Sequence, residues 1–375
     1  MRFPKDVPVL TDQGIRLRAP RLEDVEAMVE MYRDPDTQYW GGSPPTYDRE
    51  EAELDVTERI PKGWRARTRR TWAIEYGGEY AGAITLTSGE SRVGSVGFTG
   101  HPAYRGKGIA TRAVRLVLAH AFDDLGWYRV TWGAFVGNWA ARRVAWRTGF
   151  RNFFTAHGAE PADGERRDEW IASIGWDDER EPQNHWWQVP VIETERFRLR
   201  EYRDSDVDRA AEMSNDERTL HWLANLPKPF GREHAELRYL ARDREGRASG
   251  DRVAWAVADP DTDELLGDVG VFGLHGRSDR TSGELGYSAH PEARGRGLIT
   301  AAVGRVIEQA FLPIDEGGLG RLRLEIRAAK GNSASIQVAE ANGFTRAGVL
   351  RAADHRRDGS YDDLVVFDLL ISDRG

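Results

Sequence analysis

HPAYRGKGIAT, residues 101–111, returns in the same chain as HPEARGRGLIT, residues 290–300. Each copy follows an apolar run that predicts a strand, and each precedes an apolar stripe that predicts a helix, at 114–122 and 303–311. Glycines in such a turn let backbone N–H groups crowd around a phosphate, and the helix N-terminus adds the positive end of its dipole. The repeat therefore predicts two similar domains, each with a site for a ligand that carries a pyrophosphate.

Length and composition narrow the class of protein. A chain of 375 residues with 40% hydrophobic and 30% charged residues fits two domains, each with its own core. The net charge of −8 argues against nucleic acid as a partner, because binding a phosphate backbone requires a basic face. The chain contains no cysteine, which excludes disulfides, thiolate metal ligands and a cysteine nucleophile, and we expect no metal. No apolar run suits a signal peptide or membrane span, so we expect a cytoplasmic protein.

The two halves show the same order of predicted elements: a short strand, helices, antiparallel strands, strand–glycine turn–helix, strand–helix, and two final strands. Four antiparallel strands are expected at 71–75, 79–86, 252–258 and 265–271, and two strands after the repeated helix at 128–134 and 321–327. Asp163-Gly164 and Asp358-Gly359 predict the turns between the final strands. The polar stretch 179–190 predicts a linker between domains at 1–178 and 191–375. This order predicts a mixed α/β sheet that binds its ligand at the carboxyl ends of parallel strands.

At this point the pattern resembles the pyrophosphate motif of the GNAT superfamily of acyl-CoA-dependent N-acyltransferases. The resemblance rests on Arg105, Gly108 and Ala110, on a downstream Asn and Gly-Phe, and on the twelve residues from that Asn to that Phe in both copies. It covers 9–178 and 191–373. The second half is similar to the branch that acetylates ribosomal-protein N-termini, through GELGY, RGRGLIT and GNxxS. The resemblance implies two tandem GNAT-like domains, each with a centrally splayed mixed sheet flanked by helices, and acetyl-CoA or another acyl-CoA as co-substrate.

The chain departs from the family pattern at two places. Ile299 stands where the family usually has Gly or Ala. A tyrosine that serves many members as general acid lies four residues before the Phe of Gly-Phe, and here those positions are Trp146 and Glu340.

The resemblance implies that the two turns hold the pyrophosphate; alternatively, they are only structural turns into helices. The residues concerned are Arg105, Gly106, Lys107, Gly108, Ile109 and Ala110 in the first half, and Arg294, Gly295, Arg296, Gly297, Leu298 and Ile299 in the second. Lys107 and Arg296 either add charge near the CoA phosphates or are solvated. Asn138 and Asn332 either contact pantetheine or only cap the helices that follow them.

Two glutamates are candidates for taking the proton from an amine. Glu284 lies in the strand before the second motif, and Glu325 lies in the next strand, so both flank the expected cleft. A carboxylate there can accept the proton directly or through water. The alternative is a strand glutamate that is ion-paired with Arg323 or Arg327.

Ser335 is the candidate proton donor to the departing thiolate, as the resembling branch implies. The alternative is an ordinary residue of a first helical turn, since Asn332 three positions earlier is a good N-cap. The first half has Ser95, Thr131 and Ala141 at the places that match Glu284, Glu325 and Ser335. It therefore lacks all three candidate proton-transfer groups.

We therefore predict a tandem N-acyltransferase whose second half is the catalyst and whose first half is auxiliary. The acyl group would pass directly from CoA to a primary amine, on a small molecule or a peptide N-terminus, because no cysteine exists to carry it. Two alternatives remain: a CoA-binding or interaction protein without turnover, and a chain whose halves both act on different amines. The sequence predicts neither a nucleic-acid nor a membrane partner and indicates no oligomeric state.

Overall fold

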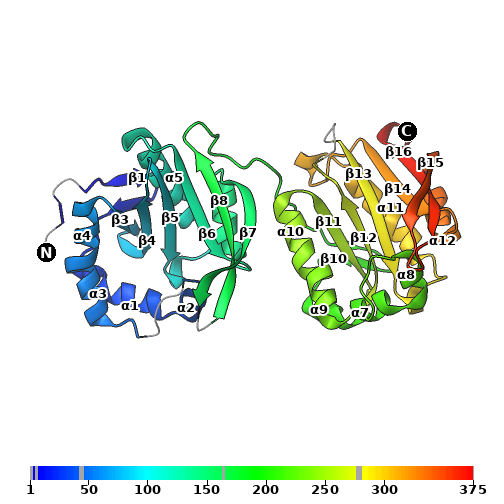
Figure 1. Cartoon of the computed structure of the whole chain (residues 1–375), viewed down its shortest axis with the longest axis horizontal. Coiled ribbons are helices and arrows are strands. Elements are labelled where there is room, and N and C mark those ends of the chain that lie inside the picture. Colours follow the sequence, from blue (N-terminus) through cyan, green and yellow to red (C-terminus); the bar gives the residue numbers. More distant parts are fainter. Residues whose placement is uncertain (1–2, 5–6, 42–45, 163–164, 276–280, 375) are drawn as a thin grey trace. The chain divides into compact units, whose positions relative to one another are not determined.

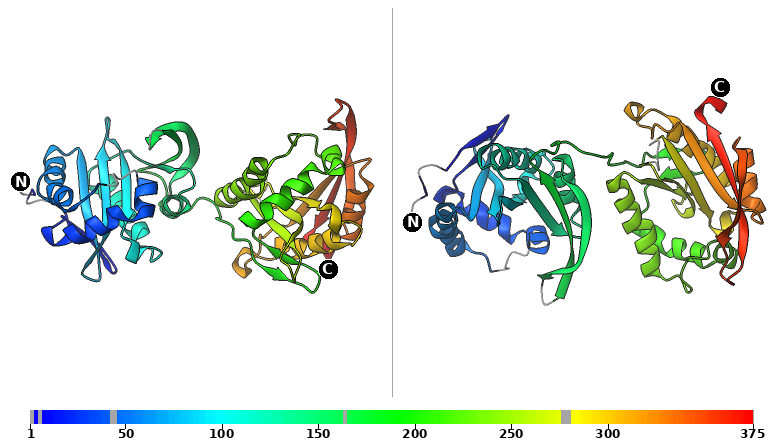
Figure 2. Two further views of the ribbon diagram at one scale, coloured as in Figure 1. Left: turned by 90° about the horizontal axis from the view of Figure 1, so that it is seen from below. Right: turned by 45° about the horizontal axis from the view of Figure 1, so that its top comes forward.

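The computed structural model describes residues 3–4, 7–41, 46–162, 165–275 and 281–374. The chain divides into two compact units, Met1–Gln183 and Asn184–Gly375. This division falls inside 179–190, the stretch in which the sequence predicts the linker. Each unit contains one eight-stranded sheet in the described residues, with helices against it (Figures 1 and 2).

The first unit follows the predicted order. Its elements are β1 (Leu10–Asp12), β2 (Ile15–Arg18), α1 (Val25–Arg33), α2 (Pro35–Gly41), α3 (Arg49–Leu54), α4 (Ile60–Ala66), β3 (Arg69–Tyr76), β4 (Glu79–Ser88), β5 (Val93–Gly100), α5 (Ile109–Ala119), β6 (Arg129–Phe135), α6 (Trp139–Arg147), β7 (Arg151–Ala162) and β8 (Glu165–Gly175). The strand order is β1-β2-β3-β4-β5-β6-β8-β7. The pair β5–β6 is parallel and the other pairs are antiparallel.

The second unit repeats this arrangement. Its elements are β9 (Ile192–Glu193), β10 (Arg198–Arg200), α7 (Val207–Asn215), α8 (Glu217–Trp222), α9 (Arg232–Ala235), the π-helical turn η6 (Glu236–Ala241), α10 (Arg242–Ser249), β11 (Arg252–Ala258), β12 (Leu265–Phe272), β13 (Ser282–Ala289), α11 (Leu298–Phe311), β14 (Arg323–Ala329), α12 (Ser333–Ala341), β15 (Thr345–His355) and β16 (Tyr361–Leu370). The strand order is β15-β16-β14-β13-β12-β11-β10-β9, again with one parallel pair, β13–β14.

Both faces of each sheet are buried, which explains the nearly continuous apolar runs of the central strands. In β11, Val253 and Trp255 pack in the same cluster as Val303 and Val306 of α11. The residue between them, Ala254, packs in a second cluster with the α7 and η6 side. Alternate residues of one strand therefore serve two different layers.

The parallel strands separate in both units, as the resemblance implies. In the first unit, β5 and β6 pair only over Val93–Ser95 and Arg129–Thr131, although β5 continues to Gly100 and β6 to Phe135. In the second, β13 and β14 pair only as far as Leu285 and Ile326, although they continue to Ala289 and Ala329. Each sheet is thus splayed at its centre, and beyond the last pair the backbone groups of the two parallel strands no longer bond to each other.

The final hairpin of the second unit turns at Asp358-Gly359 as predicted, with Gly359 at a φ of 85° between β15 and β16. The matching prediction for the first unit, Asp163-Gly164, lies outside the described residues. Among the helices of the described ranges, none combines the length and the apolar character that a membrane crossing requires.

Candidate functional site

The glycine turns have the geometry of an anion cradle in both units. Gly106 and Gly108 have φ angles of 77° and 73°, and Gly295 and Gly297 have 71° and 68°. Gly108 and Gly297 are the N-caps of α5 and α11. A Cβ atom on any of these four glycines would meet nothing within 4 Å. Backbone N–H groups at the start of a long helix, next to open space, suit a pyrophosphate, and the residues present therefore fit CoA.

The first arginine of each turn is bound by a neighbouring helix. In the second unit, Nη2 of Arg294 lies 2.6 Å from Oδ2 of Asp216 and 3.0 Å from Oγ1 of Thr219. Asp216 is the N-cap of α8 and also accepts the N–H of Thr219 at 3.0 Å. Burial acts to raise the pKa of Asp216, but the hydrogen bonds from Arg294 and Thr219 outweigh it and hold the pKa below its usual value. In the first unit, Arg105 contacts Asp34 and donates to Thr37 at 2.9 Å in the same way.

A hollow of about 540 Å³ adjoins the turn of the first unit. It is lined by Gly108, Thr111, Arg112, Arg115, Trp146, Arg147, Glu181 and Pro182. Its three arginines correspond to Ala301, Gly304 and Ala341, so none of them has a counterpart at the matching position of the second copy. Lys107 of the same turn lies over the ring of Tyr104, 4.9 Å from its centroid. The hollow therefore joins the glycine turn to three arginines, of which Arg115 lies 3.5 Å from Glu181.

The candidate carboxylates of the second unit meet through an arginine. Glu284 and Glu325 are direct partners in the parallel pair β13–β14. Nε of Arg327 lies 2.5 Å from Oε1 of Glu325 and 3.7 Å from Oε2 of Glu284. Arg323 also donates to Glu325, at 3.1 Å, and approaches Asp368 at 3.2 Å. The ion pairs expected as the alternative interpretation of Glu325 are thus present.

The two glutamates differ in environment. Burial acts to raise the pKa of Glu325, but the hydrogen bonds from Arg327 and Arg323 outweigh it, and the pKa lies below its usual value. The side chain of Glu325 is 16% exposed, whereas that of Glu284 is 42% exposed. Glu325 is a fixed anion that orients Arg327, and Glu284 is the carboxylate that solvent or an acceptor reaches more easily.

Ser335 lies in the first turn of α12 beside a tyrosine that sequence analysis did not single out. The hydroxyl of Tyr287 is 2.9 Å from Oγ of Ser335 and 3.0 Å from its carbonyl oxygen. Burial raises the pKa of Tyr287 to about 12, although the bond to Ser335 acts to lower it, so the phenol keeps its proton at neutral pH. The available signal was the aromatic residue that follows Gly in each copy, which is Tyr287 here and Phe98 in the first half.

Each of the two cap asparagines accepts a hydrogen bond from a backbone N–H group through its side-chain oxygen. Oδ1 of Asn138 accepts the N–H of Ala141 at 3.1 Å, and Oδ1 of Asn332 accepts the N–H of Ser335 at 3.2 Å. This is the N-cap bond that the residue type favours. It fixes Ser335 at the start of α12.

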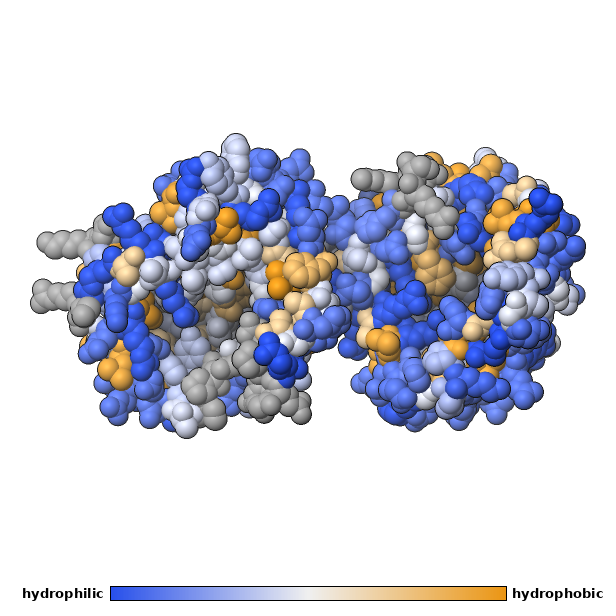
Figure 3. All heavy atoms as spheres, in the orientation of Figure 1, coloured by the Kyte–Doolittle hydropathy of each residue, from blue (hydrophilic) through white to orange (hydrophobic). Residues whose placement is uncertain are grey.

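The two groups of candidate residues lie on opposite faces of the sheet. Tyr287 and Leu285 of β13 pack against the α11 layer. Glu284 alternates with them along the strand, so it points to the other face of the sheet, together with its partner Glu325 of β14. The ladder between β13 and β14 ends at Leu285 and Ile326, so the two glutamates lie in its paired part and Tyr287 lies beyond it. Figure 3 shows the outer surface in one view, and it is largely hydrophilic over both units.

The comparison with known proteins also divides the chain into two similar parts. The family model described as acetyltransferase (GNAT) domain matches residues 15–151 and again 196–345. Similar solved structures include a GNAT acetyltransferase from Bacillus anthracis, which is 20% identical, with coverage of 46% of this chain and 100% of that chain and a TM-score of 0.41. Ribosomal-protein-S5-alanine acetyltransferase from Vibrio fischeri is 21% identical, with coverage of 48% and 96% and a TM-score of 0.42. RimJ from Mycobacterium smegmatis, in complex with CoA-disulfide, is 22% identical, with coverage of 46% and 90% and a TM-score of 0.41. No curated protein matches the chain.

Proposed function

The chain belongs to the acetyltransferase (GNAT) family, whose model covers it twice, and we propose that it is a tandem N-acetyltransferase in which the second unit is the catalyst. The observation that carries this proposal is a difference between two otherwise similar sites. Both units have the open glycine turn and the splayed strands. Only the second has carboxylates in the paired part of the parallel strands, where the first has Ser95 and Thr131. Only the second has the Tyr287–Ser335 hydroxyl pair, where the first has Phe98 and Ala141.

The proposed acceptor is a primary amine, on a small molecule or at a peptide N-terminus. Such an amine is mostly protonated at neutral pH, and it must lose a proton before its nitrogen attacks the acyl carbon. Glu284 is the better placed acceptor of that proton because its side chain is the more exposed, and Nε of Arg327 lies 3.7 Å from its Oε2. Glu325 remains the alternative base. A positioned base of this kind contributes about 10²–10⁴-fold to the rate.

The carbon–sulfur bond breaks as the carbon–nitrogen bond forms, and the thiolate then takes a proton. Ser335 is proposed as the donor, with Tyr287 as the hydroxyl that replaces its proton. Their 2.9 Å contact supports this chain of two hydroxyls. The ammonium nitrogen loses two protons in all. The first passes to Glu284 and on to solvent before the attack, and the second, lost after the attack, offsets through solvent the proton that the thiolate gains.

The first unit is proposed to bind acetyl-CoA without turning it over. Its turn depends on backbone N–H groups, which the missing carboxylates do not affect. The arginine-lined hollow beside Gly108 supports binding of a ligand with several phosphates. An alternative is that both units act on different amines, and a second is that neither turns over.

A screen of primary amines and short peptides with acetyl-CoA, with free thiol as the readout, tests the proposal. We expect turnover that is lost in Glu284→Gln or Glu325→Gln and kept in Ser95→Ala, which changes the matching position of the first unit. Binding of CoA without turnover on any amine would instead favour a CoA-binding protein. Turnover that is lost in Ser95→Ala and kept in both glutamine variants would assign catalysis to the first unit.

A further inference from the structure

Helix α8 is anchored at its N-terminal end to the cofactor turn. Arg294, the first arginine of the turn, donates through Nη2 to Asp216 and Thr219, at 2.6 and 3.0 Å. Asp216 caps α8, and the Arg294 side chain is only 25% exposed. The positive charge of Arg294 is therefore neutralised by a carboxylate of the same unit, and its Nη2 group is occupied.

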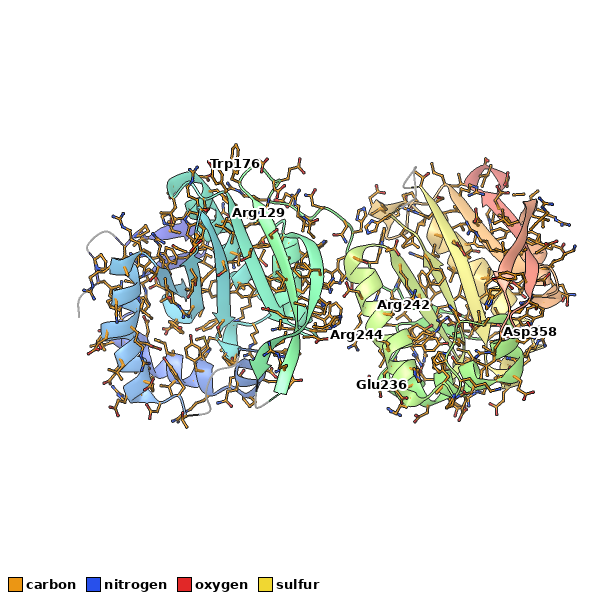
Figure 4. All side chains as sticks on the ribbon, viewed as in Figure 1. Arg129, Trp176, Glu236, Arg242, Arg244 and Asp358 are labelled. Atoms are coloured by element: carbon orange, nitrogen blue, oxygen red, sulfur yellow. The ribbon has the colours of Figure 1, made fainter. Side chains whose placement is uncertain are left out.

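The C-terminal end of α8 is anchored to the loop that carries the start of α12. Arg356, in the turn between β15 and β16, lies 4.4 Å from the ring of Trp222 and donates to the carbonyl of His221 at 3.4 Å. Arg356 also donates to Asp362 at 2.8 Å, and Asp362 accepts the N–H of Gly331 at 3.2 Å. Figure 4 labels Asp358 in this same hairpin turn.

Trp222 completes this second anchor by packing on glycine. Its Cη2 atom lies 3.3 Å from the position that a Cβ on Gly331 would take. Gly331 immediately precedes Asn332, which caps the helix that begins with Ser333 and holds Ser335. Helix α8 thus bridges the phosphate turn and the segment that presents the proposed proton donor.

The same bridge occurs in the first unit, where an Arg–Asp–Thr contact and a Trp–Gly contact of the same kind build it. Arg105 donates to Thr37 at 2.9 Å and contacts Asp34, at the start of α2. At the other end, Arg167 of β8 donates to the carbonyl of Tyr39 at 2.9 Å and lies 5.7 Å from the ring of Trp40. Trp40 approaches Gly137 as Trp222 approaches Gly331, at 3.1 Å. Both units therefore tie the glycine turn to the start of the helix after the next strand through one short helix.

We propose that Arg294 is a positioning residue, which ties α8 to the turn and so fixes Ser335 relative to the bound thioester, and that it is not a phosphate ligand. Phosphate binding falls to the backbone N–H groups of the turn, which need no side chain. This inference rests on the proposal that the second unit is the catalyst.

The test separates cofactor affinity from turnover. We compare Arg294→Gln, Asp216→Asn and the double variant with wild type, using calorimetry with CoA at low and high salt and thiol release with the best amine of the screen. We expect CoA affinity within about threefold of wild type at both salt concentrations, and kcat lowered at least tenfold in each single variant. The double variant should be no slower than the slower single variant, because either change already removes one charge of the same ion pair.

Controls keep the result interpretable. Arg305→Gln removes an exposed ion pair with Glu308 on α11 and should change neither quantity. Arg294→Lys keeps the charge and an N–H donor group but loses the planar guanidinium, and we expect it to recover part of kcat; it replaces Arg294→Gln in the comparison if that variant does not fold. A tenfold or larger loss of CoA affinity in Arg294→Gln that shrinks at high salt, with normal affinity in Asp216→Asn, would make Arg294 a phosphate ligand and overturn the inference.

The failure of the proposed function gives a different result. If Arg105→Gln lowers kcat and Arg294→Gln does not, catalysis belongs to the first unit. In a protein without turnover, hydrogen exchange of the α8 amides provides the readout. Faster exchange in Arg294→Gln at unchanged CoA affinity would support the bridge, and unchanged exchange would refute it.

Discussion

Gly108→Val tests whether the first unit binds CoA through its turn. Gly108 has a φ of 73° and caps α5, and a Cβ there meets nothing within 4 Å. The folded protein can therefore accept the side chain sterically, and the cost to stability is that of the left-handed backbone, about 1–2 kcal/mol. A β-branched residue resists this conformation, so the turn should also shift.

The expected effect on binding is larger than the effect on folding. A valine side chain fills the open space beside the turn and displaces the phosphate from the helix N-terminus. Loss of two hydrogen bonds to a charged group costs roughly 3–6 kcal/mol, at about 1.5–3 kcal/mol each. At about 1.4 kcal/mol for each factor of ten, the affinity of the first site should fall by about 10²–10⁴-fold.

Calorimetry on the full chain measures this directly. Wild type should bind two CoA molecules, and Gly108→Val should bind one in the accessible concentration range. Gly77→Val is the matched control, because Gly77 has a φ of 63° and equally open space but lies in the turn between β3 and β4. It should lose similar stability and keep both sites. A single site in wild type that survives Gly108→Val would refute the reasoning and make the first unit structural.

Three further predictions concern the second unit. Glu284→Gln should lower kcat at neutral pH by about 10²–10⁴-fold, with partial recovery at higher pH where the amine is already deprotonated; a larger loss in Glu325→Gln would transfer the role of base to that residue. Ser335→Ala and Tyr287→Phe should each cost less than this, since water can protonate a thiolate, and thiol release should show that combining them adds little. Burial raises the pKa of Asp243 to about 6, against the opposing charges of Arg247 and Arg252. The folded chain thus keeps a proton that the unfolded chain loses near pH 4, so this group weakens folding as pH rises from about 4 to 6. When the free energy of unfolding is measured in urea, Asp243→Asn should therefore lose less of it than wild type between pH 4 and 7, by at most about 3 kcal/mol. An equal dependence of the two unfolding free energies on pH would show that Asp243 is not protonated in the native state.

The sequence by itself was sufficient for the parts of this protein that depend on short-range chemistry. An Arg-Gly-x-Gly run before an apolar stripe requires left-handed glycines and a helix start, and Gly106, Gly108, Gly295 and Gly297 all have positive φ angles. The strand expected at 71–75 lies inside β3, and the two copies of the motif predicted two similar units. Propensity, turn chemistry and an internal repeat are all readable from neighbouring residues.

Only the tertiary structure decided which side chains meet. Arg294 contacts Asp216, 78 residues away, and Tyr287 contacts Ser335, 48 residues away. Both contacts arise from the packing of a helix against a strand end or a turn, which no local pattern encodes. The register of β13 against β14 placed Glu284 opposite Glu325, and a shift of one residue would have sent one of them to the other face. The motif by itself therefore predicts that this arginine is a phosphate ligand. The partner that the arginine contacts belongs to a helix that lies far upstream in the sequence.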